Sequence, residues 1–155
     1  KFMYYISKSV PVKINFSEMA RDLELSRDEL PKYLEYLEKA ELVSVLRMKA
    51  NGDAILRKMD KLYLQNSNMS YVLSGENPDT GNARETIFYC WTKQKYDTVE
   101  SPVSVFEIDG KTFEVGGRNK GKKQISNLED AYVVKDTIEY VFDNQVPLWM
   151  FGFLY

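Results

Sequence analysis

The sequence of 155 residues contains no histidine and a single cysteine, Cys90. The absence of histidine excludes His-based acid–base catalysis, Ser-His-Asp triads and His-ligated zinc. One cysteine cannot form an internal disulfide, and no signal peptide is visible at the start, so a reducing, cytoplasmic location is expected. Without a histidine to activate it, Cys90 is interpreted as a buried, inert thiol.

Long apolar runs and phosphate-binding loops are also missing. No run reaches the length needed to span a bilayer, and the apolar end of the chain, residues 147–155, is too short, so no membrane partner is expected. No G-x-x-x-x-G-K-[ST] motif occurs, which removes the usual basis for ATP binding. The net charge of −2 argues against a surface that coats nucleic acid uniformly.

The composition is that of a folded chain. Hydrophobic residues make up 44% and aromatic residues 14%, enough for a packed core. The chain begins at Lys1, without methionine, and is already in amphipathic sequence. We interpret it as a piece of a longer protein, with a removed leader as the alternative.

The first half has the pattern of a helix–turn–helix unit. Helices are predicted over residues 1–10 and 16–23, and Ser26-x-x-Glu29 is a capping box that starts a third helix. Pro31 follows closely, so a bend or a later start is expected. Strands are predicted at 42–46 and 61–65, around a turn with Asn51-Gly52 at its apex. This order predicts a winged-helix domain over residues 1–64.

The second half, residues 65–155, has the pattern of a small α/β unit related to restriction endonucleases. A helix is predicted over 82–95, a strand over 131–134, and a hairpin turning at Asp109-Gly110. Such nucleases need an Asp on the first hairpin strand and Glu-x-Lys on the second, to hold Mg²⁺ and to polarise a water. Here Glu114 is present, but Val105 and Gly116 stand where the Asp and the Lys are needed.

The chain as a whole resembles the C-terminal region of bacterial and archaeal AAA-type P-loop ATPases, in which an ATPase module precedes a winged helix and a nuclease-like domain of unknown function. The resemblance rests on the order and spacing of segments 16–20 (FSEMA), 25–27 (LSR), 33–38 (YLEYLE), 61–64 (KLYL), 81–86 (GNARET), 113–117 (FEVGG), 123–125 (KQI), 131–134 (AYVV) and 147–149 (PLW). It implies an upstream ATPase module as partner, with ATP and Mg²⁺ bound there and no cofactor in this region.

Basic residues indicate how such a region could bind a partner. The third helix, over residues 26–40, carries three basic and four acidic residues and is poorly suited to the major groove. The wing and a later loop are richer in cations, and contact with nucleic acid or a protein partner is expected through Arg47, Lys49, Arg57, Lys58, Arg118, Lys120, Lys122 and Lys123. The expected function is therefore that of a non-catalytic accessory module of the ATPase.

Two alternatives remain open. A divergent Mg²⁺-dependent nuclease would use Glu85, Glu107 and Glu114, with Lys120 or Arg118 in place of the missing lysine. A free-standing winged-helix transcription regulator is the other, disfavoured by the acidic third helix.

The aromatic C-terminus, including Trp149 and Phe153, is expected to pack in the core, with an interface patch as the alternative.

Overall fold

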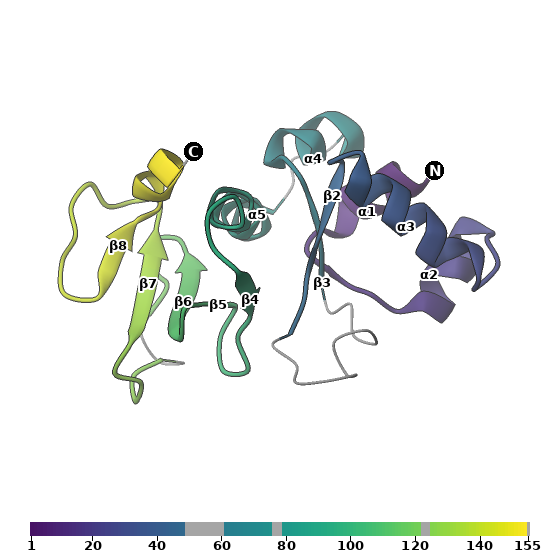
Figure 1. Ribbon diagram of the computed structural model, residues 1–155. Helices are drawn as coiled ribbons and strands as arrows, with labels where there is room; N and C mark the ends of the chain where they lie inside the picture. Colours follow the sequence, from purple (N-terminus) through teal and green to yellow (C-terminus); the bar gives the residue numbers. More distant parts are fainter. Residues whose placement is uncertain (49–60, 76–78, 122–124, 155) are drawn as a thin grey trace.

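The protein has a mixed α+β fold with two sheets. The structure, a computed structural model, describes residues 1–48, 61–75, 79–121 and 125–154 (Figure 1). Its elements are α1 (Phe2–Ser9), β1 (Val12–Lys13), α2 (Phe16–Leu23), α3 (Glu29–Lys39), β2 (Val43–Leu46), β3 (Lys61–Leu64), α4 (Ser67–Ser74), α5 (Thr80–Thr92), β4 (Thr98–Glu100), β5 (Phe106–Ile108), β6 (Lys111–Gly116), β7 (Ala131–Lys135), β8 (Gln145–Pro147) and the 3₁₀ helix η2 (Leu148–Leu154).

The first sheet is antiparallel, with strand order β1-β3-β2, and is covered by α1, α2 and α3 (Figure 1). The two predicted strands are present and pair antiparallel, with Val43 opposite Leu64 and Leu46 opposite Lys61. Strand β1 was not predicted; its two residues pair with the other edge of β3. The predicted Asn51-Gly52 turn lies outside the described residues.

The predicted capping box precedes α3. The Ser26 amide donates to the Glu29 carboxylate (2.9 Å), and the Glu29 amide donates to the Ser26 hydroxyl (3.2 Å). Because the helix begins only at Glu29, Pro31 lies in its first turn, where an amide hydrogen is not needed. The later start is thus confirmed. Leu30 and Leu34 of this helix are buried, whereas Tyr33 is exposed.

The second sheet has strand order β4-β5-β6-β7-β8, antiparallel as far as β6 and parallel beyond it. The predicted hairpin joins β5 and β6. Asp109 and Gly110 have φ values of 50° and 78°, which is the backbone that a tight two-residue turn requires. Helix α4 and strands β4 and β8 were not predicted.

Helix α5 lies between the two sheets (Figure 1). Phe88 packs against Phe106 on one side, with ring centroids 5.0 Å apart, and the Cys90 thiol donates to the Leu64 carbonyl on the other. The core is therefore continuous between the sheets. The predicted division at residue 64 falls between β3 and α4, and this core crosses it. No described helix is long and apolar enough to cross a membrane.

Candidate functional site

A buried carboxylate, Glu114 on β6, is the centre of the candidate site. Its side chain is 2% exposed, and its neighbours along the strand, Phe113 and Val115, are apolar. The Ser104 hydroxyl donates to Oε2, and the Lys120 ammonium forms an ion pair with Oε1. These two partners replace the water that the carboxylate loses on burial.

Lys120 reaches this carboxylate because of the glycine at position 116. A Cβ at Gly116 would lie 2.6 Å from both Cβ and Cγ of Lys120, so the lysine stem occupies the space that a side chain there would need. A turn, in which the Lys120 amide donates to the Gly117 carbonyl (3.0 Å), brings the lysine back over β6. A lysine four residues further along the chain thus covers the position where a Glu-x-Lys motif has its lysine.

A second acid, Glu85 on α5, lies near this pair. The Tyr63 hydroxyl donates to its carboxylate at 3.3 Å. Burial raises the pKa of the Glu85 carboxyl above its ordinary value, and the charge of Glu114 adds to the rise. This rise in pKa is partly offset by the charges of Lys61 and Lys120 and by the hydrogen bond from Tyr63. Lys61 is itself paired with Glu100 at 3.0 Å, which links β3 of the first sheet to β4 of the second.

The third predicted acid, Glu107, lies on β5, where it pairs with Val99 of β4 and Thr112 of β6. Within the described residues, no three His, Cys, Asp or Glu side chains lie close enough to hold a metal ion together. Glu85 and Glu114 are therefore near neighbours in the structure, but the three predicted acids do not converge on one point.

An open cleft of about 620 Å³ lies beside the site, between the start of α5 and the end of β6. Its lining includes Arg84, Glu85, Arg118 and Lys120. Arg84 is paired with Asp136 at 2.6 Å, and Lys120 is paired with Glu114. Arg118 is exposed and forms no ion pair with any described residue, which leaves its charge available to a ligand.

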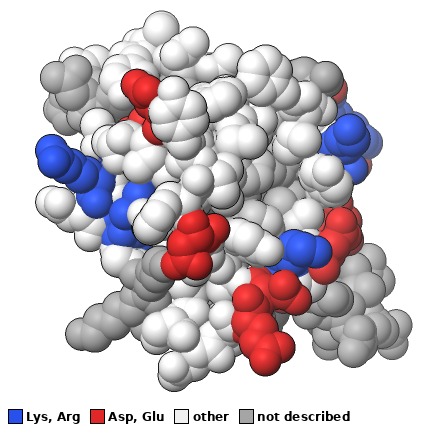
Figure 2. Space-filling view, turned by 90° about the vertical axis from the view of Figure 1, so that its left-hand side faces the viewer, with Lys and Arg blue, Asp and Glu red and all other residues white. Residues whose placement is uncertain are grey.

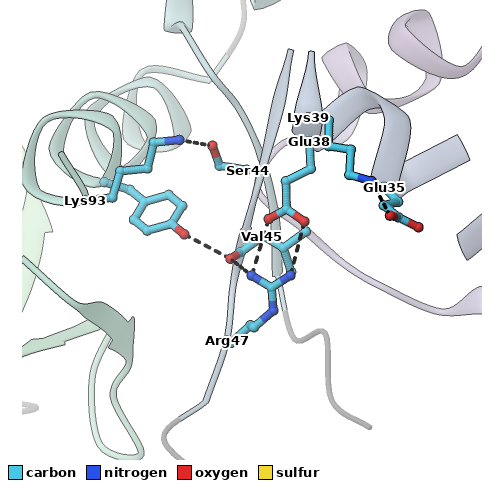
Figure 3. A network of polar contacts seen from close by, with 8 residues as sticks. Glu35, Glu38, Lys39, Ser44, Val45, Arg47 and Lys93 are labelled. Atoms are coloured by element: carbon cyan, nitrogen blue, oxygen red, sulfur yellow. Dashed lines mark hydrogen bonds and ion pairs between the residues drawn. The ribbon is translucent and has the colours of Figure 1, made fainter. Parts of the chain in front are cut away.

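Most of the other basic residues predicted to bind a partner lie outside the residues that the structure describes. Arg47 is described, and its guanidinium is paired with Glu38 (3.1 Å) and also donates to the Val45 carbonyl (3.4 Å) (Figure 3). Lys49, Arg57, Lys58, Lys122 and Lys123 lie outside the described residues. Of the predicted cations that the structure describes, Arg118 alone is therefore without an acidic partner among the described residues.

Sequence reasoning missed a polar network between α5 and the first sheet. The Lys93 ammonium donates to the Ser44 hydroxyl (Figure 3). It also donates to Gln65 Oε1, and the Tyr89 hydroxyl donates to the Val45 carbonyl at 2.9 Å. No motif links these positions, because they come from three separate elements. Lys93 lies within the helix predicted over residues 82–95, and no role was assigned to it.

Cys90 and the aromatic C-terminus can now be placed. Cys90 is buried, as expected, and burial raises its pKa to about 11. In η2 every third residue shares a face, so Phe151 packs against Phe88, with ring centroids 4.7 Å apart. Trp149 and Phe153 are 50% and 79% exposed, so the expected core packing is wrong for them. On the side of the molecule where β8 lies, acidic and basic side chains are scattered among uncharged ones (Figure 2).

The fold and the site define a mixed α+β protein with a buried glutamate on the central strand of its second sheet, paired with a partly exposed lysine that follows the strand. The chain belongs to the family described as Domain of unknown function (DUF8612), whose model matches residues 1–80. The match covers the whole first sheet and its helices and ends at the start of α5. No curated protein and no solved structure is significantly similar to the chain.

Proposed function

We propose that this chain is a non-catalytic recognition module of a AAA-type ATPase, built from a winged-helix unit and a nuclease-like unit whose metal site has been replaced by an internal ion pair. The order α1-β1-α2-α3-β2-β3, with sheet order β1-β3-β2, supports the winged-helix part. Helix α5 followed by three antiparallel strands and a parallel β7 supports the nuclease-like part.

The ion pair between Lys120 and Glu114 carries the proposal. A nuclease of this type needs Glu114 to face a hydrated cation, because Mg²⁺ is held by carboxylate charge. Here the carboxylate is 2% exposed, and its two oxygens are taken by Lys120 and Ser104. The charge that a metal would use is neutralised within the protein, while the fold around it is kept as a scaffold.

Binding is assigned to the basic loop after β6 rather than to α3. Helix α3 uses part of its charge internally, since Lys39 pairs with Glu35 (2.6 Å) and Glu38 with Arg47. Arg118 is exposed at the rim of the cleft between α5 and β6. Contact of this loop with phosphate groups would position nucleic acid without reading its bases.

Fluorescence anisotropy with a short labelled duplex tests this assignment. We expect weak binding at low salt that falls steeply with added salt, and a loss of at least fivefold in the variant Arg118→Gln/Lys122→Gln/Lys123→Gln, which spares Lys120. The control Lys13→Gln/Lys32→Gln/Lys111→Gln removes the same charge from exposed positions elsewhere. Equal losses in both variants, or no binding at low salt, would reject nucleic acid as the partner.

A divergent nuclease is the second candidate, because Lys120 contacts Glu114 much as the lysine of Glu-x-Lys would, and Glu85 lies nearby. Incubation of plasmid DNA with Mg²⁺ or Mn²⁺ separates the two candidates. The recognition module leaves the plasmid intact. Cleavage that is lost in Glu114→Gln would establish the nuclease instead.

A further inference from the structure

A second pocket lies on the opposite side of α5 from the second sheet, and its balance of charge differs from that of the cleft beside Glu114. It has a volume of about 290 Å³ and lies where α3, β2 and the end of α5 meet. We call it the Lys93 pocket, and its polar lining includes Glu38, Glu41, Ser44, Arg47, Gln65 and Lys93, together with Tyr89 and Gln94. Figure 3 shows Lys93 extending from α5 toward Ser44, with the Glu38–Arg47 pair on the other side of β2's Val45.

Two of the four charges in this pocket are not paired. Glu38 and Arg47 neutralise each other at 3.1 Å. Lys93 and Glu41 form no ion pair with any residue of the described chain. Burial lowers the pKa of the Lys93 amine overall, and the nearby Cys90, Glu41 and Glu38 act in the opposite direction. A half-buried cation and an exposed anion thus line one pocket without touching.

Hydrogen-bond donors in the pocket are also left over. The Lys93 ammonium has three N–H groups, and the described chain accepts two of them, at Ser44 Oγ and Gln65 Oε1. Gln65 Oε1 also accepts from Ser44 at 2.7 Å, so this oxygen is fully used. No described residue accepts from the Gln65 side-chain NH₂ group. The unused groups beside the lysine are therefore donors, which suits an anion.

From these observations we infer that the Lys93 pocket binds a small zwitterion of the α-amino-acid type, with its carboxylate at Lys93 and Gln65 and its ammonium at Glu41. A lysine and a glutamate without ionic partners among the described residues line the same pocket, which suits a ligand that carries both signs. A simple anion would leave Glu41 uncompensated. At about 30 Å³ for a water-sized group, the volume accommodates roughly ten non-hydrogen atoms. This inference is independent of the recognition function proposed above.

Three probes of similar size test the inference by NMR titration of the ¹⁵N-labelled protein. Alanine carries both charges, propionate the carboxylate alone and ethylammonium the ammonium alone. We expect alanine to shift the Gln65 side-chain NH₂ resonances with millimolar affinity, and the other two probes to bind at least fivefold more weakly. Propionate binding as tightly as alanine, or no shift with alanine, would overturn the proposal.

Two variants locate the charges. Lys93→Gln and Glu41→Gln should each weaken alanine binding at least fivefold, whereas Lys95→Gln and Glu139→Gln, at exposed positions away from the pocket lining, should leave it unchanged. Glu41 is exposed, so its substitution is not expected to disturb the fold, and far-UV circular dichroism checks this. Unchanged alanine binding in Glu41→Gln would overturn the assignment of the ammonium.

Discussion

Two partly buried lysines in this molecule have opposite electrostatic situations. Lys120, after β6, covers Gly116 and is paired with the buried carboxylate of Glu114. Lys93, at the end of α5, donates only to the uncharged side chains of Ser44 and Gln65 among the described residues.

We call the first site closed, because its charge is paired within the protein, and the second open, because its charge has no acidic partner among the described residues. A buried charge that is paired and hydrogen-bonded within the protein contributes to the fold and has little left for a ligand. A half-buried charge with neutral partners keeps its desolvation cost, which an incoming counterion can offset. The charge of Lys120 is thus used within the fold, whereas the charge of Lys93 is left for the ligand that we propose for its pocket.

The largest expected effect comes from breaking the closed pair. Lys120→Met leaves the Glu114 charge buried, and we expect a loss of about 3 kcal/mol of unfolding free energy, at the lower end for a broken buried pair because the lysine is 36% exposed. Urea denaturation measures it. The double variant Lys120→Met/Glu114→Gln should recover much of the loss. A loss below about 1 kcal/mol would mean that the pair is not closed.

A smaller loss is expected when the space for Lys120 is filled. In Gly116→Ala the new Cβ would lie 2.6 Å from the lysine stem, and we expect a cost of about 1–3 kcal/mol from the forced rearrangement. Gly121→Ala is the matched control, because nothing lies within 4 Å of a Cβ there. Thermal unfolding of the two variants compares them, and equal melting temperatures would contradict the packing of Lys120 over Gly116.

On the side of the Lys93 pocket, the contact between α5 and β2 can be weakened without touching a charge. Tyr89→Phe removes the hydroxyl that donates to the Val45 carbonyl, and we expect a loss of about 1 kcal/mol in urea denaturation. Tyr36→Phe, at an exposed position of α3, should change nothing measurable. An unchanged unfolding free energy in Tyr89→Phe would show that this hydrogen bond does not hold α5 against the first sheet.

The smallest effect is a dependence on pH. Because the folded-state pKa of Glu85 is raised, the folded protein binds a proton more tightly there than the unfolded chain, and stability falls as the pH rises from about 4.5 through the raised value. Glu85→Gln should remove this fall and still accept the Tyr63 hydrogen bond. Unfolding free energies measured across this range should be flatter in the variant. An identical slope in both proteins would contradict the burial of Glu85.

The local elements were predictable where the signals were local. The Ser26–Glu29 capping box and the Asp109-Gly110 turn each fix a start or a reversal within four residues, and both are present. Helix α4 was missed, although Asn66 caps it and Gly75 ends it, because its polar residues resemble a loop. Strands β1 and β8 have two and three residues, too few for a hydrophobic period to show.

The candidate sites depended on contacts between distant segments. The sequence indicated that Glu114 matters and that a lysine is missing beside it, but that Lys120 covers Gly116 follows only from the turn at residues 117–120. The Lys93 network joins residues 44, 65 and 93, and no spacing rule connects them. Arg47, expected at a binding surface, is paired with Glu38, since α3 passes beside β2.

The contrast between the two lysines is tested most directly by unfolding Lys120→Met and Lys93→Met side by side in urea at neutral pH. Lys93→Met removes a charge without an acidic partner and leaves the Ser44–Gln65 hydrogen bond in place, so its cost should stay within about 1 kcal/mol. The account predicts that Lys120→Met is the more damaging by about 2 kcal/mol. Equal losses, or a larger loss in Lys93→Met, would contradict it.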